Sequence, residues 1–374
     1  MGEELIKRIL VTGAHGFIGN NLTVRLRELT NTDVITFGRD NSIKTLKNLV
    51  NQVDFIVHLA GENRPTDSTA FDLVNIDLTR TLCSAIEVTG RNIPLIVASS
   101  RQAENDSLYG KSKLAAEVVV KDYVAKTKNS VCIYRLPGVF GKWCKPNYNS
   151  VVATFCHNIA RELPIEISDP GVSLNLVYID DLIDDFLSII EKFPPGVSKA
   201  KLRQTYDITV GELAKKIKSF DNCRKNLTLG KVGVGIDHAL YATFVSYLPK
   251  EKFTYELPRY DDERGSFVEI LKTSESGQFS FITIQPGMSR GSHYHHSKTE
   301  KFLIIKGIAR LRFRHLITNE RYEVTVCGGK STIIDSIPGW VHEITNVGES
   351  KAYAIVWANE LFDSKQPDTV AQEV

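Results

Sequence analysis

The 374-residue chain lacks the features that mark several classes of protein. No apolar run approaches the ~18 residues that a membrane-spanning helix needs. The net charge of +2 is too small for the basic surface of a protein that binds nucleic acid or an anionic membrane. The six cysteines include no CxxC pair, which excludes a disulfide scaffold and indicates free thiols in a reducing compartment. The segment Met1–Glu4 has neither the basic start nor the apolar stretch of a secretory signal. We therefore expect a cytoplasmic protein with no nucleic-acid or membrane partner.

What remains is an ordinary globular composition with one local excess. Hydrophobic residues make up 42% and charged residues 24% of the chain, which is near the average for soluble domains. At roughly 150 residues per domain, the length predicts two or three domains. Five of the nine histidines follow residue 290, namely His293, His295, His296, His315 and His342.

The first half of the chain alternates short apolar runs with helical patterns. We expect buried strands at Ile9–Thr12, Val34–Phe37, Phe55–Leu59, Leu95–Ser99 and Val131–Leu136. We expect helices at Phe17–Leu29, Leu73–Thr89 and Ser112–Lys126. This order predicts an α/β domain of the Rossmann type, with a doubly wound parallel sheet.

The pattern changes after about residue 253. Short strand-like runs punctuated by Gly and Pro follow at Phe279–Ile284, Glu300–Ile305, Arg310–Phe313, Arg321–Val326 and Ala352–Trp357. Such runs predict an all-β module, either a sandwich or a barrel. The polar, Pro-containing stretch Tyr247–Lys250 separates the two patterns, so we expect domains at 1–247 and 248–374.

Three glycines follow the first expected strand and open the first expected helix. Gly13 permits a tight turn, Gly16 lets the backbone approach a pyrophosphate, and Gly19 packs the helix on the strand. The helix N-terminus then favours the phosphate charge. The alternative is a Gly-rich turn without a ligand, but the strand before and the helix after favour a dinucleotide site.

The end of the second expected strand leaves the type of dinucleotide open. An acidic residue such as Asp40 would bind a ribose 2′-hydroxyl and favour NAD. Arg39 could instead meet the 2′-phosphate of NADP, or it could be a solvated loop arginine.

A tyrosine and a lysine follow the fourth expected strand. Tyr109 and Lys113 are four residues apart, so on a helix they share one face. A nearby ammonium favours the tyrosine phenolate, and the pair can exchange a proton with a carbonyl oxygen while a hydride moves to carbon. Ser99 or Ser100 at the strand end could hydrogen-bond the same oxygen, although both could simply be turn or cap residues.

These motifs resemble an extended short-chain dehydrogenase/reductase over about residues 6–245. The match also includes His58–Gly61, Asn75, Arg135–Gly141 and Val177–Asp181. The resemblance implies a nicotinamide cofactor in the sheet crevice and a nucleotide sugar held by the C-terminal part of this domain. It implies cofactor contacts from Thr12, Gly13, His15, Gly16, Phe17, Ile18, Gly19, Arg39, Leu59, Ala60, Gly61, Lys113 and Leu136.

The chain departs from this family in two places. The stretch from Ser100 to Tyr109 is much shorter than in most members, which leaves open which serine acts. Arg101 and Gln102 stand where sugar 4,6-dehydratases carry an acidic pair beside the catalytic Ser or Thr. The missing pair favours a plain reductase over a dehydratase.

The late histidines fall into a spaced pattern. His293 and His295 alternate along one expected strand, Glu300 begins the next, and His342 comes from a distant one. Three imidazoles and a carboxylate suit a divalent transition metal such as zinc, nickel, iron or manganese. We expect His296 and His315 to be incidental surface residues. With the surrounding Gly, Pro and Asn positions, the spacing resembles both motifs of the cupin superfamily.

A second local pattern resembles the cupin epimerases of deoxysugar pathways. It covers Asp261–Glu269 and Arg290–His293. That resemblance implies that His293 is a general base which removes a proton next to a keto group. Metal binding and base catalysis compete for His293, and the sequence leaves this choice open. A tyrosine acid could be Tyr294, Tyr322 or Tyr353.

Across essentially its whole length, the chain resembles the CapF/WbjC type of bifunctional capsular polysaccharide enzyme. The resemblance implies that the cupin epimerises C3 of a UDP-4-keto-6-deoxy-N-acetylhexosamine. The reductase would then reduce C4 with NADPH to UDP-2-acetamido-2,6-dideoxy-L-talose, a precursor of UDP-N-acetyl-L-fucosamine. It also implies zinc in the cupin and a homodimer.

Three alternatives remain open at this stage. One is a cupin epimerase whose Rossmann domain binds a nucleotide sugar without catalysis. Another is a non-enzymatic cupin sensor of a small molecule or a metal. A weaker third is an NAD-dependent 4-epimerase with an accessory cupin.

Overall fold

The computed structural model describes residues 7–273, 275–362 and 365–374. The chain divides into two compact units. The first consists of Met1–Ile217 and Ala239–Leu248, and the second of Lys218–His238 and Pro249–Val374. Residues 218–238 therefore belong to the second unit, although they precede the boundary expected near residue 247.

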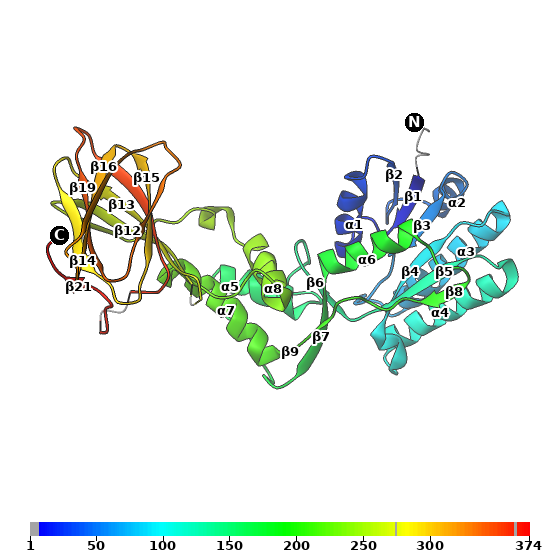
Figure 1. Ribbon diagram of the computed structural model, residues 1–374. Coiled ribbons are helices and arrows are strands. Elements are labelled where there is room, and N and C mark those ends of the chain that lie inside the picture. Colours follow the sequence, from blue (N-terminus) through cyan, green and yellow to red (C-terminus); the bar gives the residue numbers. More distant parts are fainter. Residues whose placement is uncertain (1–6, 274, 363–364) are drawn as a thin grey trace, which may run out of the picture. The chain divides into compact units, whose positions relative to one another are not determined.

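A six-stranded parallel sheet forms the centre of the first unit (Figure 1). Its strand order is β2-β1-β3-β4-β5-β8. The strands are β1 (Lys7–Thr12), β2 (Thr32–Phe37), β3 (Phe55–His58), β4 (Leu95–Ser100), β5 (Val131–Leu136) and β8 (Val197–Lys199). The five strands expected from the apolar runs are thus confirmed, and with them the Rossmann-type fold.

Helices cover both faces of this sheet (Figure 1). The main helices are α1 (Phe17–Arg27), α2 (Ile43–Val50), α3 (Leu78–Thr89), α4 (Leu108–Thr127) and α6 (Ile179–Glu191). Helix α3 packs between α2 and α4, and α1 packs against α6. The apolar sides of α2, α3 and α4 pack against the strands in one buried cluster. This cluster includes Leu46, Leu82, Leu95 and Val120.

The position of one helix differs from the expectation. Helix α4 begins at Leu108, four residues before the expected start at Ser112, because the Ser107 hydroxyl caps it by accepting from the Gly110 amide over 3.0 Å. Two short helical segments lie directly before or close to the main helices. They are η1 (Phe71–Asp77) before α3 and η2 (Arg101–Glu104) before α4.

The strand order creates a crevice at a defined place. Strand β1 lies between β2 and β3. The chain therefore adds β2 on one side of β1 and then crosses over to add β3 on the other side. In the register of the sheet, Thr12 lies beside both Phe37 and His58, and these three residues end their strands together. Ligands of open parallel sheets bind at such a switch point, beyond the carboxyl ends of the strands.

The remaining elements before the all-β part lie between residues 138 and 252. Strands β6 (Gly138–Phe140), β7 (Ser173–Tyr178) and β9 (Tyr206–Thr209) form a three-stranded sheet. The other elements are α5 (Val151–Ala160), α7 (Val210–Asn226), β10 (Thr228–Leu229), α8 (Gly235–Ser246) and η3 (Lys250–Lys252). Among the described residues, no helix has both the length and the apolar character to cross a membrane.

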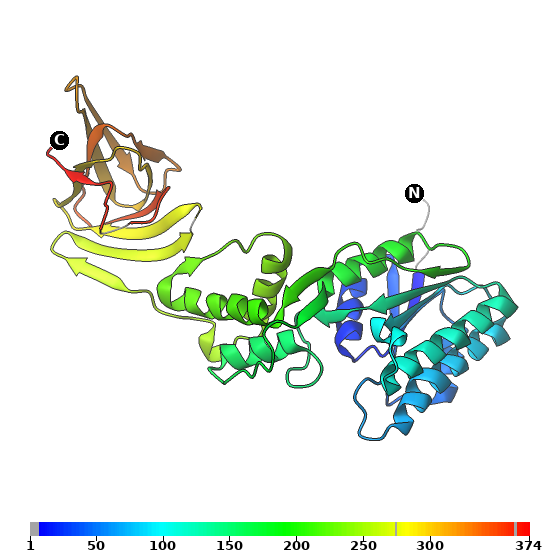
Figure 2. The ribbon, with the colours of Figure 1, turned by 90° about the horizontal axis from the view of Figure 1, so that it is seen from below.

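The second unit is built around two sheets, whose strands pair antiparallel except for the short parallel pair of β10 and β12 (Figure 2). One has the order β10-β12-β13-β20-β15-β18 with β11 beside β12, and the other has the order β17-β16-β19-β14-β21. Its strands are β11 (Arg259–Asp262), β12 (Gly265–Thr273), β13 (Gly277–Ile284), β14 (Ser289–Tyr294), β15 (Glu300–Lys306), β16 (Ile308–His315), β17 (Arg321–Cys327), β18 (Ile333–Ser336), β19 (Trp340–Asn346), β20 (Ala352–Ala358) and β21 (Val370–Ala371).

Apolar side chains of both sheets form one core in this unit. Ile282, Phe302 and Ala354 come from the first sheet, and Leu311 and Ile344 from the second. The alternating burial along β15 and β16 places one side of each strand in this core. Two packed antiparallel sheets are the arrangement of a cupin-like jelly roll, which confirms the expected all-β class.

Candidate functional site

The turn between β1 and α1, together with the first turn of α1, leaves no room for a side chain at Gly13 or Gly19. Gly13 has φ +67°, and a Cβ there would lie 2.6 Å from the Ala60 amide nitrogen. A Cβ on Gly19 would lie 2.2 Å from the Gly13 oxygen. Gly16 precedes Phe17, the first residue of α1, so the helix N-terminus opens directly from this turn. That geometry fits the pyrophosphate of a dinucleotide.

A buried chain of polar groups holds the end of β3 against β1. The Thr12 hydroxyl lies 2.7 Å from His58 Nδ1, and His58 Nε2 lies 3.0 Å from the Thr79 hydroxyl of α3. The Ala60 amide donates to the Thr12 hydroxyl over 3.3 Å. Burial, together with the charge of Lys113, lowers the pKa of His58 to about 3, so its imidazole is neutral. Thr79 has no distinctive sequence signal beyond its place four residues after Asn75.

The residues that would meet a 2′-phosphate lie at the end of β2. The Arg39 side chain is 88% exposed and pairs with Glu62 over 2.9 Å. The imidazole of His15 lies beside Gly38, because a Cβ on Gly38 would come within 2.7 Å of that ring. Tyr148 donates to the second Glu62 oxygen over 3.2 Å. Glu62 follows the expected contact Gly61 directly, and sequence reasoning missed it.

Tyr109 and Lys113 both lie on α4, as the spacing predicts, and the two serines differ in their contacts. Ser99 donates to the buried carboxylate of Glu117 over 2.6 Å. Ser100 accepts from the Gln102 amide, and its hydroxyl lies near enough to Tyr109 to lower the pKa of that phenol. In the structure Ser100 therefore lies toward Tyr109, whereas Ser99 points toward Glu117.

The pKa values of the tyrosine and the lysine follow from burial. Burial raises the pKa of the Tyr109 phenol, and the hydrogen bond from Ser100 offsets part of this rise. The direction is opposite to the lowering expected from the ammonium, so the phenol is protonated at neutral pH. Burial lowers the pKa of Lys113 to about 8, although the Glu117 charge opposes this shift. The Lys113 ammonium donates to the Ala98 carbonyl over 2.9 Å.

Glu117 is a further residue that sequence reasoning missed. It lies on α4 one turn after Lys113, which is the only sequence signal that could have found it. Its carboxylate also binds Arg135, with Nη2 to Oε2 at 2.7 Å. Burial raises the pKa of Glu117, but hydrogen bonds from Arg135 and Ser99 outweigh it and keep the carboxylate charged.

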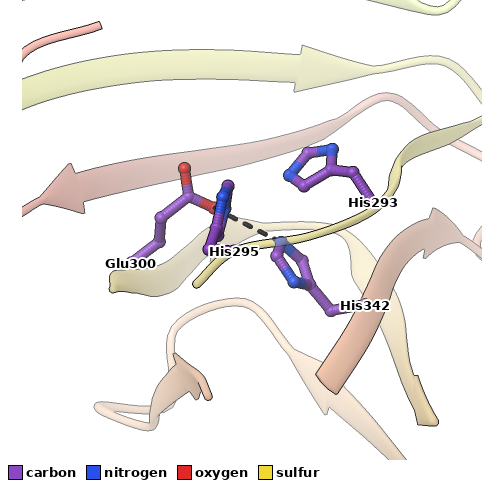
Figure 3. Close-up of side chains that lie close together, drawn as sticks. All are labelled: His293, His295, Glu300 and His342. Atoms are coloured by element: carbon purple, nitrogen blue, oxygen red, sulfur yellow. Dashed lines mark ion pairs between the residues drawn. The ribbon is translucent and has the colours of Figure 1, made fainter. Parts of the chain in front are cut away.

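The four expected metal ligands come together in the second unit (Figure 3). His293 lies near the end of β14, His295 directly follows that strand, Glu300 begins β15 and His342 lies in β19. One potential ligand atom from each lies within 4.8 Å of the others. Strand β14 is irregular between Gly291 and His293, and His293 thereby pairs with His342. A Cβ on Gly291 would lie 2.8 Å from the His342 carbonyl oxygen, so glycine permits this approach.

The donor set fits a metal ion. His293 Nε2, His295 Nε2 and His342 Nδ1 are buried without a hydrogen-bond partner. Burial lowers the pKa of His293 to about 4, so the imidazole is neutral. Burial opposes ionisation of Glu300, but the nearby rings of His295 and His342 and the Lys298 ammonium at 2.9 Å hold the pKa of its carboxyl well below its usual range. Three imidazoles and one charged carboxylate are ligands that zinc accepts.

The remaining late histidines lie away from this cluster. His296 is exposed and packs edge-on against Tyr294. His315 accepts from the Thr318 amide over 3.0 Å in the turn after β16. Of the other candidate acids, the ring of Tyr322 packs against Phe313 and that of Tyr353 against Phe281.

Comparison with known proteins agrees with the two units. A Rossmann unit with a Tyr–Lys pair and a cupin-like unit with a three-histidine cluster define a short-chain dehydrogenase/reductase fused to a cupin-like domain. The sequence model of the NAD dependent epimerase/dehydratase family matches residues 9–202. The model called polysaccharide biosynthesis C-terminal domain matches residues 260–370. The chain belongs to this epimerase/dehydratase family and, within it, to the CapF type of capsular polysaccharide enzyme.

Two similar proteins cover almost the whole chain. It is 48% identical over 98% of its length to a UDP-2-acetamido-2,6-beta-L-arabino-hexul-4-ose reductase of Pseudomonas aeruginosa, and it covers 99% of that protein. The crystal structure of the capsular polysaccharide assembling protein CapF from Staphylococcus aureus matches with a TM-score of 0.91 and 39% identity, covering 98% of this chain and 100% of that one. MoeE5 in complex with UDP-glucose and NAD shares only the fold, with 20% identity over 64% of this chain, 98% coverage of that chain and a TM-score of 0.55.

Proposed function

We propose that the protein is a nucleotide-sugar enzyme that reduces C4 of a UDP-4-keto-6-deoxy-N-acetylhexosamine after epimerisation at C3. The observation that carries the proposal is the placement of Tyr109 and Lys113 on one face of α4, next to Ser100 at the end of β4 in the Rossmann crevice. The similarity to a reductase of Pseudomonas aeruginosa along the whole chain supports the substrate class. The product would be UDP-2-acetamido-2,6-dideoxy-L-talose, for capsular polysaccharide synthesis.

The reductase chemistry belongs to residues 1–247 in this proposal. Tyr109 donates its proton to the oxygen that forms at C4, and its raised pKa keeps that proton available at neutral pH. Ser100 orients the sugar carbonyl, while Ser99 is occupied by Glu117. Lys113 supports the tyrosine oxygen as it becomes charged and holds the nicotinamide ribose. The chemistry that the cofactor supplies is the hydride for C4.

We assign NADPH to the crevice on the strength of two basic side chains. Arg39 and His15 both lie by the end of β2, where a 2′-phosphate would sit. The turn at Gly13 and Gly16 takes the pyrophosphate. The expected contacts Leu59, Ala60, Gly61 and Leu136 lie at the carboxyl ends of β3 and β5.

The epimerase chemistry belongs to residues 248–374. His293, His295, Glu300 and His342 would hold a divalent metal, and we assign zinc from the donor set. A bound cation supplies charge that stabilises an enolate. His293 is the least buried histidine of the cluster, so we propose that it is the base that removes the proton from C3. This role competes with its place among the ligands, because one nitrogen lone pair cannot hold a metal and a proton at once. We place the enzyme in the cytoplasm as a homodimer.

One experiment tests both activities. The enzyme is incubated with UDP-4-keto-6-deoxy-N-acetylhexosamine in deuterated water, with and without NADPH, and the sugar is followed by NMR. We expect deuterium at C3 without NADPH and a reduced C4 only with it. The variant Tyr109→Phe should retain the exchange at C3 and lose the reduction by about 10²-fold or more, because it lacks the proton donor.

The controls separate the two halves. His295→Ala should lose the exchange and still reduce a substrate that has already been epimerised. Reduction by Tyr109→Phe at the wild-type rate would show that the catalytic assignment is wrong. If neither the wild type nor Tyr109→Phe consumes NADPH, the first unit is a sugar-binding domain without reductase activity.

A further inference from the structure

The C-terminal segment lies against the strand that carries His293. Strand β21 pairs with β14, with Ala371 opposite His293 and Val370 opposite Tyr294. The Gln372 amide donates to the Ser292 carbonyl over 2.9 Å. Arg314 of β16 donates to the Glu373 carbonyl over 2.7 Å. These contacts hold the segment along the edge of the sheet that presents the metal cluster.

The Asp368 carboxylate binds the loop that joins two of the ligands. One oxygen accepts from the Ser297 amide at 2.7 Å and the Lys298 amide at 2.8 Å, and the other accepts from the His296 amide at 2.8 Å. The Ser297 hydroxyl adds a fourth bond at 3.0 Å. This loop is the whole connection between His295 and Glu300, so one carboxylate fixes the separation of these two ligands.

The backbone of Asp368 also acts on His295 directly. Its carbonyl oxygen is hydrogen-bonded to His295 Nδ1. Because a carbonyl can only accept, the bond requires the proton on Nδ1, which leaves the lone pair on Nε2. That nitrogen is buried without a hydrogen-bond partner and lies 3.6 Å from Glu300 Oε2, inside the cluster. A metal-binding imidazole needs this tautomer, and the group on its other nitrogen usually tunes the affinity.

We propose that Asp368 is a positioning residue of the metal centre, and that the C-terminal segment 368–372 holds His293, His295 and Glu300 in the geometry that binds the ion. The inference rests on the metal centre of the proposed function. It assigns a role to a residue that lies 26 positions after His342, the ligand nearest to it in the sequence. Asp368 does not touch the substrate in this proposal, so it acts on metal affinity and not on the chemistry.

The test measures zinc binding to the full chain after metal removal, by competition with a chromophoric chelator. We expect Asp368→Ala to bind Zn²⁺ about 10- to 100-fold more weakly and to release it faster. Asp368→Asn keeps one acceptor oxygen and should lose less. The matched control is Glu349→Ala, an exposed acidic residue of the same unit, which should bind Zn²⁺ like the wild type.

A second measurement separates positioning from unfolding. Nitrogen NMR of the His295 ring in the metal-free protein should show a proton on Nδ1 in the wild type and a mixture of tautomers in Asp368→Ala. Circular dichroism checks that the β-structure of the variant persists. Wild-type zinc affinity in a folded Asp368→Ala would overturn the inference alone. Equal zinc binding by the wild type and His295→Ala would overturn the metal centre itself, and the inference with it.

Discussion

Burial in the crevice brings the pKa of Lys113 close to neutral pH. Its ammonium donates to the Ala98 carbonyl, and burial lowers the pKa of Lys113 from 10.5 to about 8. The proton is therefore lost as the pH rises through about 8. An uncharged amine no longer supports negative charge on the Tyr109 oxygen, so we expect the kcat of C4 reduction to fall above that pH. The measurement is kcat against pH under saturating NADPH.

Lys113→Arg provides the control for this prediction. A guanidinium stays charged across the same range, so the variant should show no fall near pH 8, whatever its absolute rate. The free energy of unfolding changes with pH in the opposite direction to kcat. The unfolded chain keeps the proton up to about pH 10.5, so the free energy of unfolding contributed by this group increases from about pH 8 to 10.5. A wild-type kcat that is constant through this range would contradict the assignment.

At the scale of elements, the β1–α1 turn determines whether the dinucleotide can bind. A Cβ on Gly19 would lie 2.2 Å from the Gly13 oxygen and 2.7 Å from the Ala14 Cα. Both are backbone atoms, so the turn must open to make room. We expect Gly19→Ala to lower the free energy of unfolding by about 1–3 kcal/mol and to weaken NADPH binding. Chemical denaturation and NADPH fluorescence titration measure the two effects.

Gly230→Ala adds the same methyl group where space is free. No heavy atom lies within 4 Å of a Cβ built there. We expect a change within about 0.5 kcal/mol in unfolding free energy and no change in NADPH affinity. Equal effects of the two substitutions would show that the close contact in the turn is not the cause.

At the scale of the whole molecule, each compact unit has its own apolar core. We expect thermal unfolding by calorimetry to show two transitions. In the proposed function NADPH binds only the folded first unit, so it should shift only one transition. At 100 times its Kd it should add about 2.7 kcal/mol to the free energy of unfolding of that unit. Removal of the metal by a chelator should lower only the other. His295→Ala is the control, because its second transition should not respond to the chelator.

A single transition that both ligands shift equally would contradict this prediction. It would mean that the two units unfold as one cooperative body.

Local patterns predicted much of this molecule because their physical causes are local. The glycine spacing predicts the β1–α1 turn, since backbone clashes within a few residues exclude any other side chain. The four-residue spacing of Tyr109 and Lys113 is enough to place both on one face of α4. The spacing of the late histidines and one glutamate predicted that side chains from three strands come together. These residues are His293, His295, Glu300 and His342.

Other features depend on packing between distant segments. Ser99 and Ser100 end the same strand, and only the position of Glu117 and Tyr109 on α4 shows which serine faces the crevice. The direction of the Tyr109 pKa also needed the structure, because burial outweighs the nearby charge. Residues 218–238 join the second unit through β10, whose pairing with β12 is too short to be visible as a strand pattern.

The sequence by itself determined the fold class of each unit and predicted most of the candidate site residues, because strand and helix periodicity and ligand spacing are properties of neighbouring residues. Only the tertiary structure decided how those residues are held. The role of Asp368 is the clearest case, since its carboxylate and carbonyl reach His295 and the loop after it from more than 70 residues away along the chain. No local pattern encodes such a contact, because it exists only when β21 folds back onto β14.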